Sequence, residues 1–428
     1  MTVEVRPFEA IVYNQDKVKP EEFIAPPYDV ITPEEQNRLY ENSLYNIVRI
    51  ILSKNTSESR YEEIANTYHN WLDNSVLVQN EKPCILYLIQ EFERNGKNYT
   101  RKGFIARCRI EDFSSGNIYP HEVTMSGPKA DRLEIMKACK ANFSQIFMVY
   151  SDKDKTIEKM AEKYSTPFID VTDSLGVRNI VFKIEDEDFI SGVYNTMKDK
   201  TLLIADGHHR YETAMNYRNF VNSPDENDKT KFVMSYFTNM EDDLMIFPTH
   251  RVITKNIDVN ELLEKAGKYF DIETMPYDDS NKEEVKTAFL NYLEESNKDG
   301  IAFGLYTSTE KEFYVFKLGT DITSVFDEYD VPEALRELDL AVLHKTLLQK
   351  ELGYSEEELL AQNGILYIRQ ESEAFDMIDR GEATASFIMA YPKIEDIHKV
   401  VKHGCRMPQK STYFYPKLLS GVAINPLK

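Results

Sequence analysis

The chain has 428 residues, which is enough for two domains with hydrophobic cores of their own. Its hydrophobic fraction of 42% and its lack of low-complexity tracts are typical of a folded globular protein and exclude a disordered one. The net charge of −21 disfavours nucleic acid as a partner, because a protein that binds a polyanion needs a basic surface.

Strand and helix patterns alternate along the whole chain, which predicts an α/β or α+β fold. Before residue 255 the predicted elements are, in chain order, a hairpin of strands 85–92 and 104–113, a helix at 131–140, a strand at 144–152, a helix near 155–164, strands at 179–186 and 201–207, and a second hairpin of strands 231–242 and 244–253. From 256 to 321 the pattern predicts helix, strand, helix, strand and strand.

The pattern of the sequence changes near residue 255, where helix and strand segments with acidic loops such as YDDSNKEE begin. This change predicts a domain boundary there. We expect a core domain at 1–255 and a second α/β domain at 256–428. The C-terminal segment MPQKSTYFYPK, at 407–417, is expected to return to the site of the core domain.

The sequence has neither a signal peptide nor an apolar stretch of the roughly 18 residues that a membrane span requires. Its four cysteines are scattered, without the spacing of a disulfide framework or a zinc site. We therefore expect a cytoplasmic protein with reduced thiols and no membrane partner. The oligomeric state is not predicted.

The strongest chemical signal is the segment DGHHRY, which lies between a strand pattern and a helical pattern. His208, His209 and Arg210 therefore stand at the start of a helix, where free N–H groups and the helix dipole favour phosphate. Gly207 would allow close backbone approach or a positive φ. Asp206 opposes anion binding unless a cation intervenes, which suggests Mg²⁺ held by Asp206. The alternative is that the two histidines only cap the helix.

A second polar cluster lies in the segment PHEVTMSGPKADRLE. Glu122 is a candidate general base, Lys129 and Arg132 are candidates for holding phosphates, and His121 is a candidate for substrate binding. The structural alternative is that Asp131 caps a helix and Lys129 is a solvated charge.

Three weaker candidates complete the set, each as compatible with a structural role as with a functional one. They are Tyr28 and Asp29 at a turn stiffened by two prolines, His250 and Arg251 in an apolar strand, and Lys410, Ser411 and Thr412, with Lys417, in the C-terminal segment. We assign Tyr28, Asp29, His250 and Arg251 to substrate, and Lys410, Ser411 and Thr412 to phosphate. The common nucleotide-binding, zinc-protease and serine-hydrolase motifs do not occur in the sequence.

These segments together resemble an uncharacterised prokaryotic family known only as a domain of unknown function. The resemblance covers nearly the whole chain and rests on IAPPYDVI, LYNIVRIIL, PHEVT, PKADRL, ADGHHRYETA, PTHRV and MPQKSTYFYPK.

The DGHHR turn is also similar to the phosphate-binding motif of the ParB/sulfiredoxin superfamily, which includes CTP-binding partition proteins, sulfiredoxin and ParB-like free serine kinases. The resemblance implies a ParB/sulfiredoxin-like nucleotide-binding core in which this turn binds nucleotide phosphates. Sulfiredoxin has a catalytic cysteine where this sequence has His208, which disfavours reductase chemistry. The serine kinases begin the motif with Asp-Gly-His, as this sequence does.

The leading hypothesis is a kinase that uses ATP or ADP with Mg²⁺ to phosphorylate the hydroxyl of a small metabolite, with free serine suggested by the resemblance. Its candidate catalytic residues are Glu122, Asp206 and His208. One alternative is a nucleotide-binding switch without catalysis. Another is a metal-dependent hydrolase built from His121, Glu122, Asp206, His208 and His209.

Overall fold

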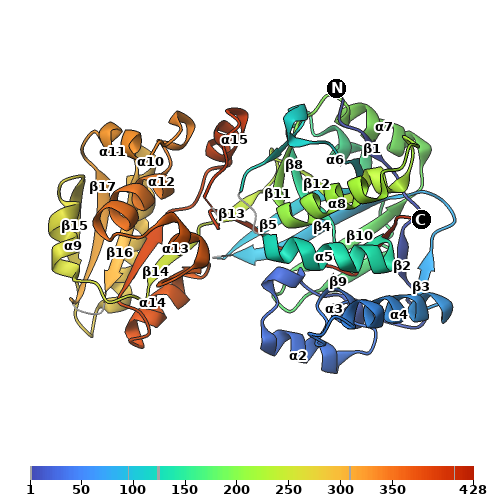
Figure 1. The fold of residues 1–428 in the computed structure, drawn as a ribbon, viewed down its shortest axis with the longest axis horizontal. Coiled ribbons are helices and arrows are strands. Elements are labelled where there is room, and N and C mark those ends of the chain that lie inside the picture. The colour runs from blue at the N-terminus through green and yellow to red at the C-terminus, as the bar shows by residue number, and fades with distance from the viewer. Residues whose placement is uncertain (1, 95, 123–125, 308–309, 409) are drawn as a thin grey trace. The chain divides into compact units, whose positions relative to one another are not determined.

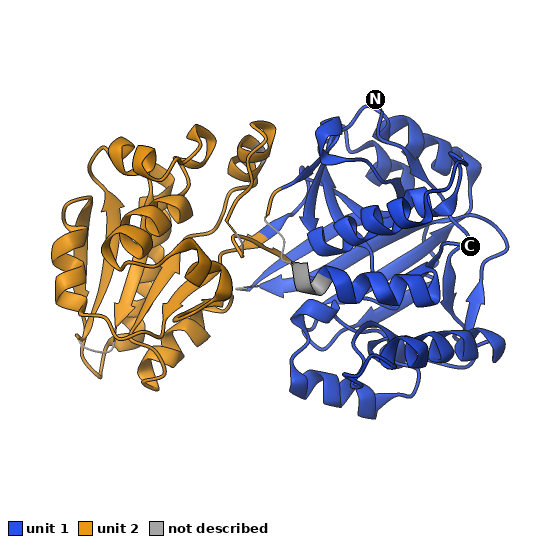
Figure 2. Cartoon of the chain, viewed as in Figure 1, with its two compact units in different colours: residues 1–120, 124–245, 416–428 blue, residues 121–123, 246–415 orange. Residues whose placement is uncertain are grey.

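The computed structural model describes residues 2–94, 96–122, 126–307, 310–408 and 410–428 (Figure 1). The chain forms two compact units: unit 1 contains residues 1–120, 124–245 and 416–428, and unit 2 contains residues 121–123 and 246–415 (Figure 2). Each unit has its own sheet and its own hydrophobic core. The division into domains 1–255 and 256–428 stays a prediction.

Unit 1 is built on a large mixed sheet, to which the described residues contribute nine strands. In spatial order these are β6 (Ile118–Pro120), β11 (Leu202–Asp206), β8 (Ile146–Tyr150), β12 (Phe232–Asn239), β5 (Lys97–Arg109), β4 (Ile85–Arg94), β10 (Arg178–Ile184) and β9 (Ile169–Thr172), with β1 (Val5–Arg6) beside β5. The pairs β6–β11 and β8–β12 are parallel, and the others are antiparallel. Every residue of β8 and β12 is buried, as expected for central strands covered on both faces.

The α-helices described in unit 1 are α1 (Pro20–Phe23), α2 (Pro33–Asn42), α3 (Val48–Ile51), α4 (Arg60–Asp73), α5 (Ser126–Cys139), α6 (Thr156–Ala161), α7 (Glu187–Met197) and α8 (His208–Val221). Of these, α5 to α8 contribute buried side chains to the core of the large sheet. Helix α5 packs between α4 and α8, and Figure 1 shows α5 and α8 side by side.

The C-terminal segment of unit 1 is tied to the middle and the start of the chain. Strand β21 (Asn425–Pro426) pairs with β7 (Ala141–Asn142). Two isolated bridges join Ala25 to Ser420 and Ile11 to Ile424. A small sheet of β2 (Ile11–Tyr13) and β3 (Leu77–Gln79) lies next to the second bridge.

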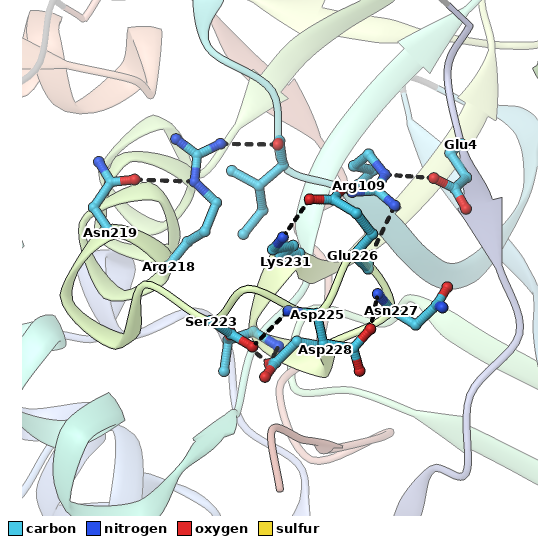
Figure 3. Close-up of polar contacts among 12 residues, drawn as sticks. Glu4, Arg109, Arg218, Asn219, Ser223, Asp225, Glu226, Asn227, Asp228 and Lys231 are labelled. Atoms are coloured by element: carbon cyan, nitrogen blue, oxygen red, sulfur yellow. Dashed lines mark hydrogen bonds and ion pairs between the residues drawn. The ribbon is translucent and has the colours of Figure 1, made fainter.

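The loop after α8 is fixed by a charged network around Glu226 (Figure 3). Its carboxylate is paired with Arg109 of β5 at 3.2 Å and with Lys231 at 2.7 Å. Arg109 also pairs with Glu4, near the start of the chain. Because the Glu226 side chain is 74% exposed, water and salt screen this network, and we expect it to set the position of the loop more than the stability of the unit.

Unit 2 contains a second sheet, whose described strands pair in antiparallel fashion. In spatial order they are β15 (Phe270–Pro276), β17 (Glu312–Leu318), β16 (Ala302–Thr307), β19 (Ala385–Met389), β14 (His250–Ile253) and β18 (Ile365–Ile368). A two-stranded sheet joins β13 (Met245–Phe247) to β20 (Tyr413–Tyr415). The helices are α9 (Val259–Ala266), α10 (Lys282–Asp299), α11 (Thr323–Glu328), α12 (Asp339–Leu343), which continues as a π-helix at His344–Glu351, α13 (Glu356–Ala361), α14 (Glu371–Asp379) and α15 (Ile394–Lys402).

The structure confirms the predicted hairpin of β4 and β5 and the order helix, strand, helix, strand, strand after residue 256. The second predicted hairpin, of 231–242 and 244–253, is wrong. Both edges of β12 are occupied, by β5 and by β8, while β14 pairs with β18 and β19. Among the described helices, none combines the length and the apolar character that crossing a membrane would need.

Candidate functional site

The DGHHRY segment forms a sharp strand-to-helix turn in unit 1. Strand β11 ends at Asp206, Gly207 has φ 87°, and α8 begins at His208. This left-handed conformation is one that glycine adopts without strain. A Cβ atom at Gly207 would also lie 3.0 Å from the guanidinium group of Arg210. Glycine therefore lets Arg210 fold back over the turn.

Two cations meet one carboxylate at this turn, and we call these three residues the Asp206 cluster. One oxygen of Asp206 lies 3.1 Å from the guanidinium of Arg210, and the other lies 3.3 Å from Nζ of Lys417. Arg210 also donates a hydrogen bond to the carbonyl of Gln145. The cluster carries more positive than negative charge, and it lies at the start of a 14-residue helix, where backbone N–H groups favour anions.

The cluster keeps Asp206 ionised. Burial would raise the pKa of this carboxyl, but the charges of Lys417, Arg210 and His208 outweigh burial and hold the pKa well below its usual value. Asp206 is consequently a weak base at neutral pH, and its main effect is to orient the two cations.

The depressed pKa of Asp206 predicts a specific dependence of stability on acid. The stabilisation is present above the unfolded-state pKa of about 3.9 and is lost as the pH falls towards the lower folded-state value. We expect the difference in unfolding free energy between the wild type and Asp206→Asn to be constant above about pH 5 and to shrink below about pH 4. Urea denaturation across this range measures it. Asp112→Asn, which removes an exposed carboxylate paired with Arg218, is the control, and a difference unchanged at low pH would contradict the expectation.

Lys417 also lines a cavity of about 490 Å³ in unit 1, which we call the Lys417 cavity. Its wall combines seven apolar residues with eight polar or charged ones. The lining residues are Glu21, Ile24, Ala25, Pro26, Arg38, Leu39, Glu41, Asn42, Thr172, Asp173, Ser174, Leu175, Pro416, Lys417 and Leu419. The volume lies in the range of about 300–1,000 Å³ that is typical of small-molecule sites. The cavity therefore has room for a small molecule beside Lys417.

The position of Lys417 is set by a buried polar network beneath it. Arg101 and Gln90 are both fully buried. Arg101 donates to the carbonyl of Pro416 at 2.5 Å, and Gln90 donates to the carbonyl of Lys417 at 3.3 Å. Arg101 and Gln90 also bind each other, with Nε of Arg101 3.1 Å from the Gln90 oxygen. The guanidinium of Arg101 stacks 4.6 Å from the ring centre of Phe147.

Tyr28 and Arg132 lie at a second, smaller pocket together with Arg210. This pocket has a volume of about 50 Å³, which is room for a water molecule or two and too little for a nucleotide. Arg132 lies 4.2 Å above the ring centre of Tyr28 and donates to the Asp131 carboxylate at 3.0 Å. Burial, followed by the charge of Asp29, raises the pKa of Tyr28. The structure thus brings Tyr28, Arg132 and Arg210 together at the wall of one small pocket.

Four other candidates in unit 1 are placed differently. Lys129 pairs with Glu212 of α8 at 2.7 Å, so its charge is engaged on the same helix that carries the turn. Asp29 is exposed. His208 is buried, and His209 is half-buried on the first turn of α8.

The remaining candidates belong to unit 2, where they form a cluster of their own. His121 Nε2 lies 2.8 Å from the hydroxyl of Thr412, and the Glu122 carboxylate accepts from the backbone N–H of Lys410. Arg251 donates to the carbonyl of Lys410 at 3.4 Å.

Ser411, the neighbour of Lys410, donates to the carbonyl of Pro408, and His250 accepts from the N–H of Met389 at 3.1 Å. Residues 123–125 of the PHEVT loop lie outside the described residues.

Asp206 does not fit a Mg²⁺ site in this arrangement. Each of its carboxylate oxygens already faces a cation, so little negative charge is left for a divalent ion. The described residues also contain no group of three or more His, Cys, Asp or Glu side chains arranged to hold a metal.

A family model matches residues 5–341, which is more than half of the chain. The chain belongs to the family described as Protein of unknown function (DUF1015). The match to DUF1015 includes Asp206 and Arg210 and ends before Lys417. A search of curated proteins finds no match.

Three solved structures illustrate what this DUF1015 chain is similar to. "Free serine kinase in complex with AMP" is 15% identical, with a TM-score of 0.35 over 70% of this chain and 84% of that one. "SbnI with C-terminal truncation from Staphylococcus aureus" is 11% identical, with a TM-score of 0.37 over 76% of this chain and 87% of that one. A conserved hypothetical protein from Pyrococcus furiosus is 15% identical, with a TM-score of 0.33 over 70% and 87%.

Proposed function

We propose that this DUF1015 protein is a nucleotide-dependent kinase that phosphorylates the hydroxyl of a small metabolite, and that free serine is the first acceptor to test. We propose also that unit 1 is the nucleotide-binding core, of the ParB/sulfiredoxin type that the DGHHR turn resembles. The observation that carries the proposal is the Asp206 cluster, which places Lys417 and Arg210 together at the start of α8.

Phosphoryl transfer depends mainly on positioning the reactants and neutralising the charge of the phosphates. Lys417 lies both in the Asp206 cluster and in the wall of the Lys417 cavity. A nucleotide with its base and sugar in that cavity would direct its phosphates towards Lys417 and Arg210, and the N–H groups of the first turn of α8 would add further donors. Asp206 would hold the two cations in place between turnovers.

The acceptor hydroxyl has to lose its proton during transfer, and the strongly depressed pKa of Asp206 makes it a poor base for that step. Glu122 remains the proposed base, with His121 beside it for substrate. Lys129 and Arg132 are proposed to help neutralise the charge of the phosphates. Their ion pairs with Glu212 and Asp131 offset part of their own positive charge.

The proposal is tested by incubating the full chain with ATP or ADP, Mg²⁺ and L-serine, and by looking for phosphoserine by mass spectrometry. We expect product with one of the two nucleotides, loss of product in Arg210→Gln, and a fall of about 100-fold or more in kcat with unchanged nucleotide affinity in Glu122→Gln. If calorimetry detects no binding of either nucleotide, the whole proposal fails. Binding with no product from serine or from other hydroxylated metabolites would remove the kinase.

A second candidate is a nucleotide-binding switch without turnover. It is favoured by the fact that the carboxylate beside the two cations is held ionised by them and is poorly suited to accept a proton. This candidate predicts nucleotide binding, a change in oligomeric state on binding, and no consumption of nucleotide over hours. Size-exclusion chromatography with and without ATP or ADP distinguishes it from the kinase.

A further inference from the structure

Unit 2 contains a cavity of about 310 Å³, which we call the Arg251 cavity. Arg251 of β14 lines it together with Asp339 at the start of α12 and Asp396 of α15. The segment that follows β19, Ala390 to Lys393, forms another part of the wall. The cavity thus brings one buried guanidinium, two lysines (Lys298 and Lys393) and four carboxylates (Asp299, Glu337, Asp339 and Asp396) around one space.

Arg251 is a buried cation whose hydrogen-bond partners are uncharged. It is 1% exposed. It donates to the carbonyls of Thr249 and Lys410, and its Nε lies 3.3 Å from Nε2 of His344. Burial, followed by the charge of Arg251, lowers the pKa of His344 well below its usual value, so that histidine is neutral.

Burial lowers the pKa of Arg251 to about 10, while the nearby charges of Asp339 and Glu122 oppose the shift, and the guanidinium stays charged at neutral pH. Among the described residues, no carboxylate oxygen lies within 4.0 Å of a nitrogen of the Arg251 guanidinium, which is the distance limit of an ion pair. A buried charge is costly without a counter-charge, and here the charge adjoins a cavity. A ligand carboxylate would supply that counter-charge.

Asp339 adds to the cavity a negative charge, opposite in sign to the charge of Arg251. It is half-buried and accepts a hydrogen bond from the N–H of Leu340 at 2.6 Å. Burial raises the pKa of Asp339 to about 6, with Asp396 and Glu294 raising it further and Arg251 opposing them. The ionised form, which prevails at pH 7, is therefore poorly compensated, and a ligand ammonium group would stabilise it.

We propose that the Arg251 cavity binds a small zwitterion of the α-amino-acid class, with Arg251 contacting the carboxylate and Asp339 the ammonium group. The volume is at the lower end of the range of about 300–1,000 Å³ for small-molecule sites, which suits a ligand of this size. The inference stands on unit 2 alone and does not depend on the proposed kinase activity.

The test is calorimetry on the full chain without nucleotide, using a panel of L-amino acids that includes L-serine. Ethanolamine, which lacks the carboxylate, and 3-hydroxypropionate, which lacks the amine, serve as the matched analogues of serine. We expect at least one amino acid to bind, and each lost group to weaken binding by about tenfold or more. Failure of the whole panel to bind at millimolar concentration would overturn the inference.

Two substitutions separate the roles of the charges. Asp339→Asn is expected to lose about tenfold in amino-acid affinity and to bind the amine-free analogue as well as the wild type does. Arg251→Gln is expected to lose binding of both. Arg336→Gln and Asp327→Asn, which break a pair of unit 2 outside the cavity, are the controls.

Because Arg251 is buried, its variant could misfold, and Asp339→Asn then decides the question. Wild-type affinity and wild-type discrimination in Asp339→Asn would contradict the proposal. Binding of ATP or ADP by Asp339→Asn, and of the amino acid by Lys417→Met, are each expected to be unchanged. These two results keep the failure of one proposal distinguishable from the failure of the other.

Discussion

Replacing Lys417 with methionine is expected to weaken the binding of ATP or ADP by about 10- to 100-fold. A hydrogen bond to a charged group contributes about 1.5–3 kcal/mol, and each 1.4 kcal/mol changes affinity about tenfold. Methionine retains most of the length and apolar surface of the side chain and removes only the charge that links the Lys417 cavity to Asp206. Isothermal titration calorimetry at low and at physiological salt measures the effect.

A second lysine–aspartate pair of unit 1 provides the control. Lys200 lies 3.2 Å from the Asp152 carboxylate, nearly the same separation as Lys417 from Asp206, but it does not line the Lys417 cavity. Lys200→Met should leave nucleotide affinity unchanged. Equal affinities of the wild type and Lys417→Met would exclude this lysine from the site.

Replacing Arg101 with methionine is expected to lower the free energy of unfolding by about 3 kcal/mol or more, since it breaks a buried polar network. The substitution leaves the Gln90 oxygen and the Pro416 carbonyl without this donor, and it removes the stacking on Phe147. Because the same network fixes the backbone of Lys417, we expect weaker nucleotide binding in the molecules that remain folded. Urea denaturation and calorimetry measure the two effects.

Arg107 of the same strand is the matched comparison. It also lies over an aromatic ring, 5.7 Å from the centre of Phe232, and donates to the carbonyl of Pro7 at 3.1 Å. It is half-buried, and its contacts with Pro7 and Phe232 lie outside the C-terminal segment, so Arg107→Met should destabilise less and should leave nucleotide affinity intact. A stable Arg101→Met protein with wild-type affinity would show that the network has no such role.

The sequence predicts the DGHHRY turn well because a buried strand and a helix have different periodicities, and the change between them falls at Gly207. It does not predict that Lys417 pairs with Asp206, since no local pattern reports which distant side chain meets a turn. The predicted hairpin of 231–242 and 244–253 is wrong for the same reason, because local pattern does not report which distant strands pair. The residues of β12 look like one half of a hairpin, but both of its edges are taken by strands from earlier in the chain.

Asp339 illustrates a site residue without a sequence signal. It is a single acidic residue before an apolar helical run, which is typical of an ordinary helix start. Its interest comes only from the cavity that it shares with Arg251. By contrast, Arg251 was recognisable in the sequence, because an arginine within an apolar strand needs a partner.

The return of residues 416–428 to unit 1 has a consequence for the order in which the protein can mature. During translation, all of residues 246–415 are synthesised before the segment that carries Lys417 and β21. Until residues 416–428 have been added, unit 1 has β7 unpaired, and Arg101 and Gln90 lack the carbonyls of Pro416 and Lys417 as acceptors. Nucleotide binding through Lys417 would accordingly require a chain that includes residues 416–428, and a product that ends before Lys417 could not compete for the nucleotide pool.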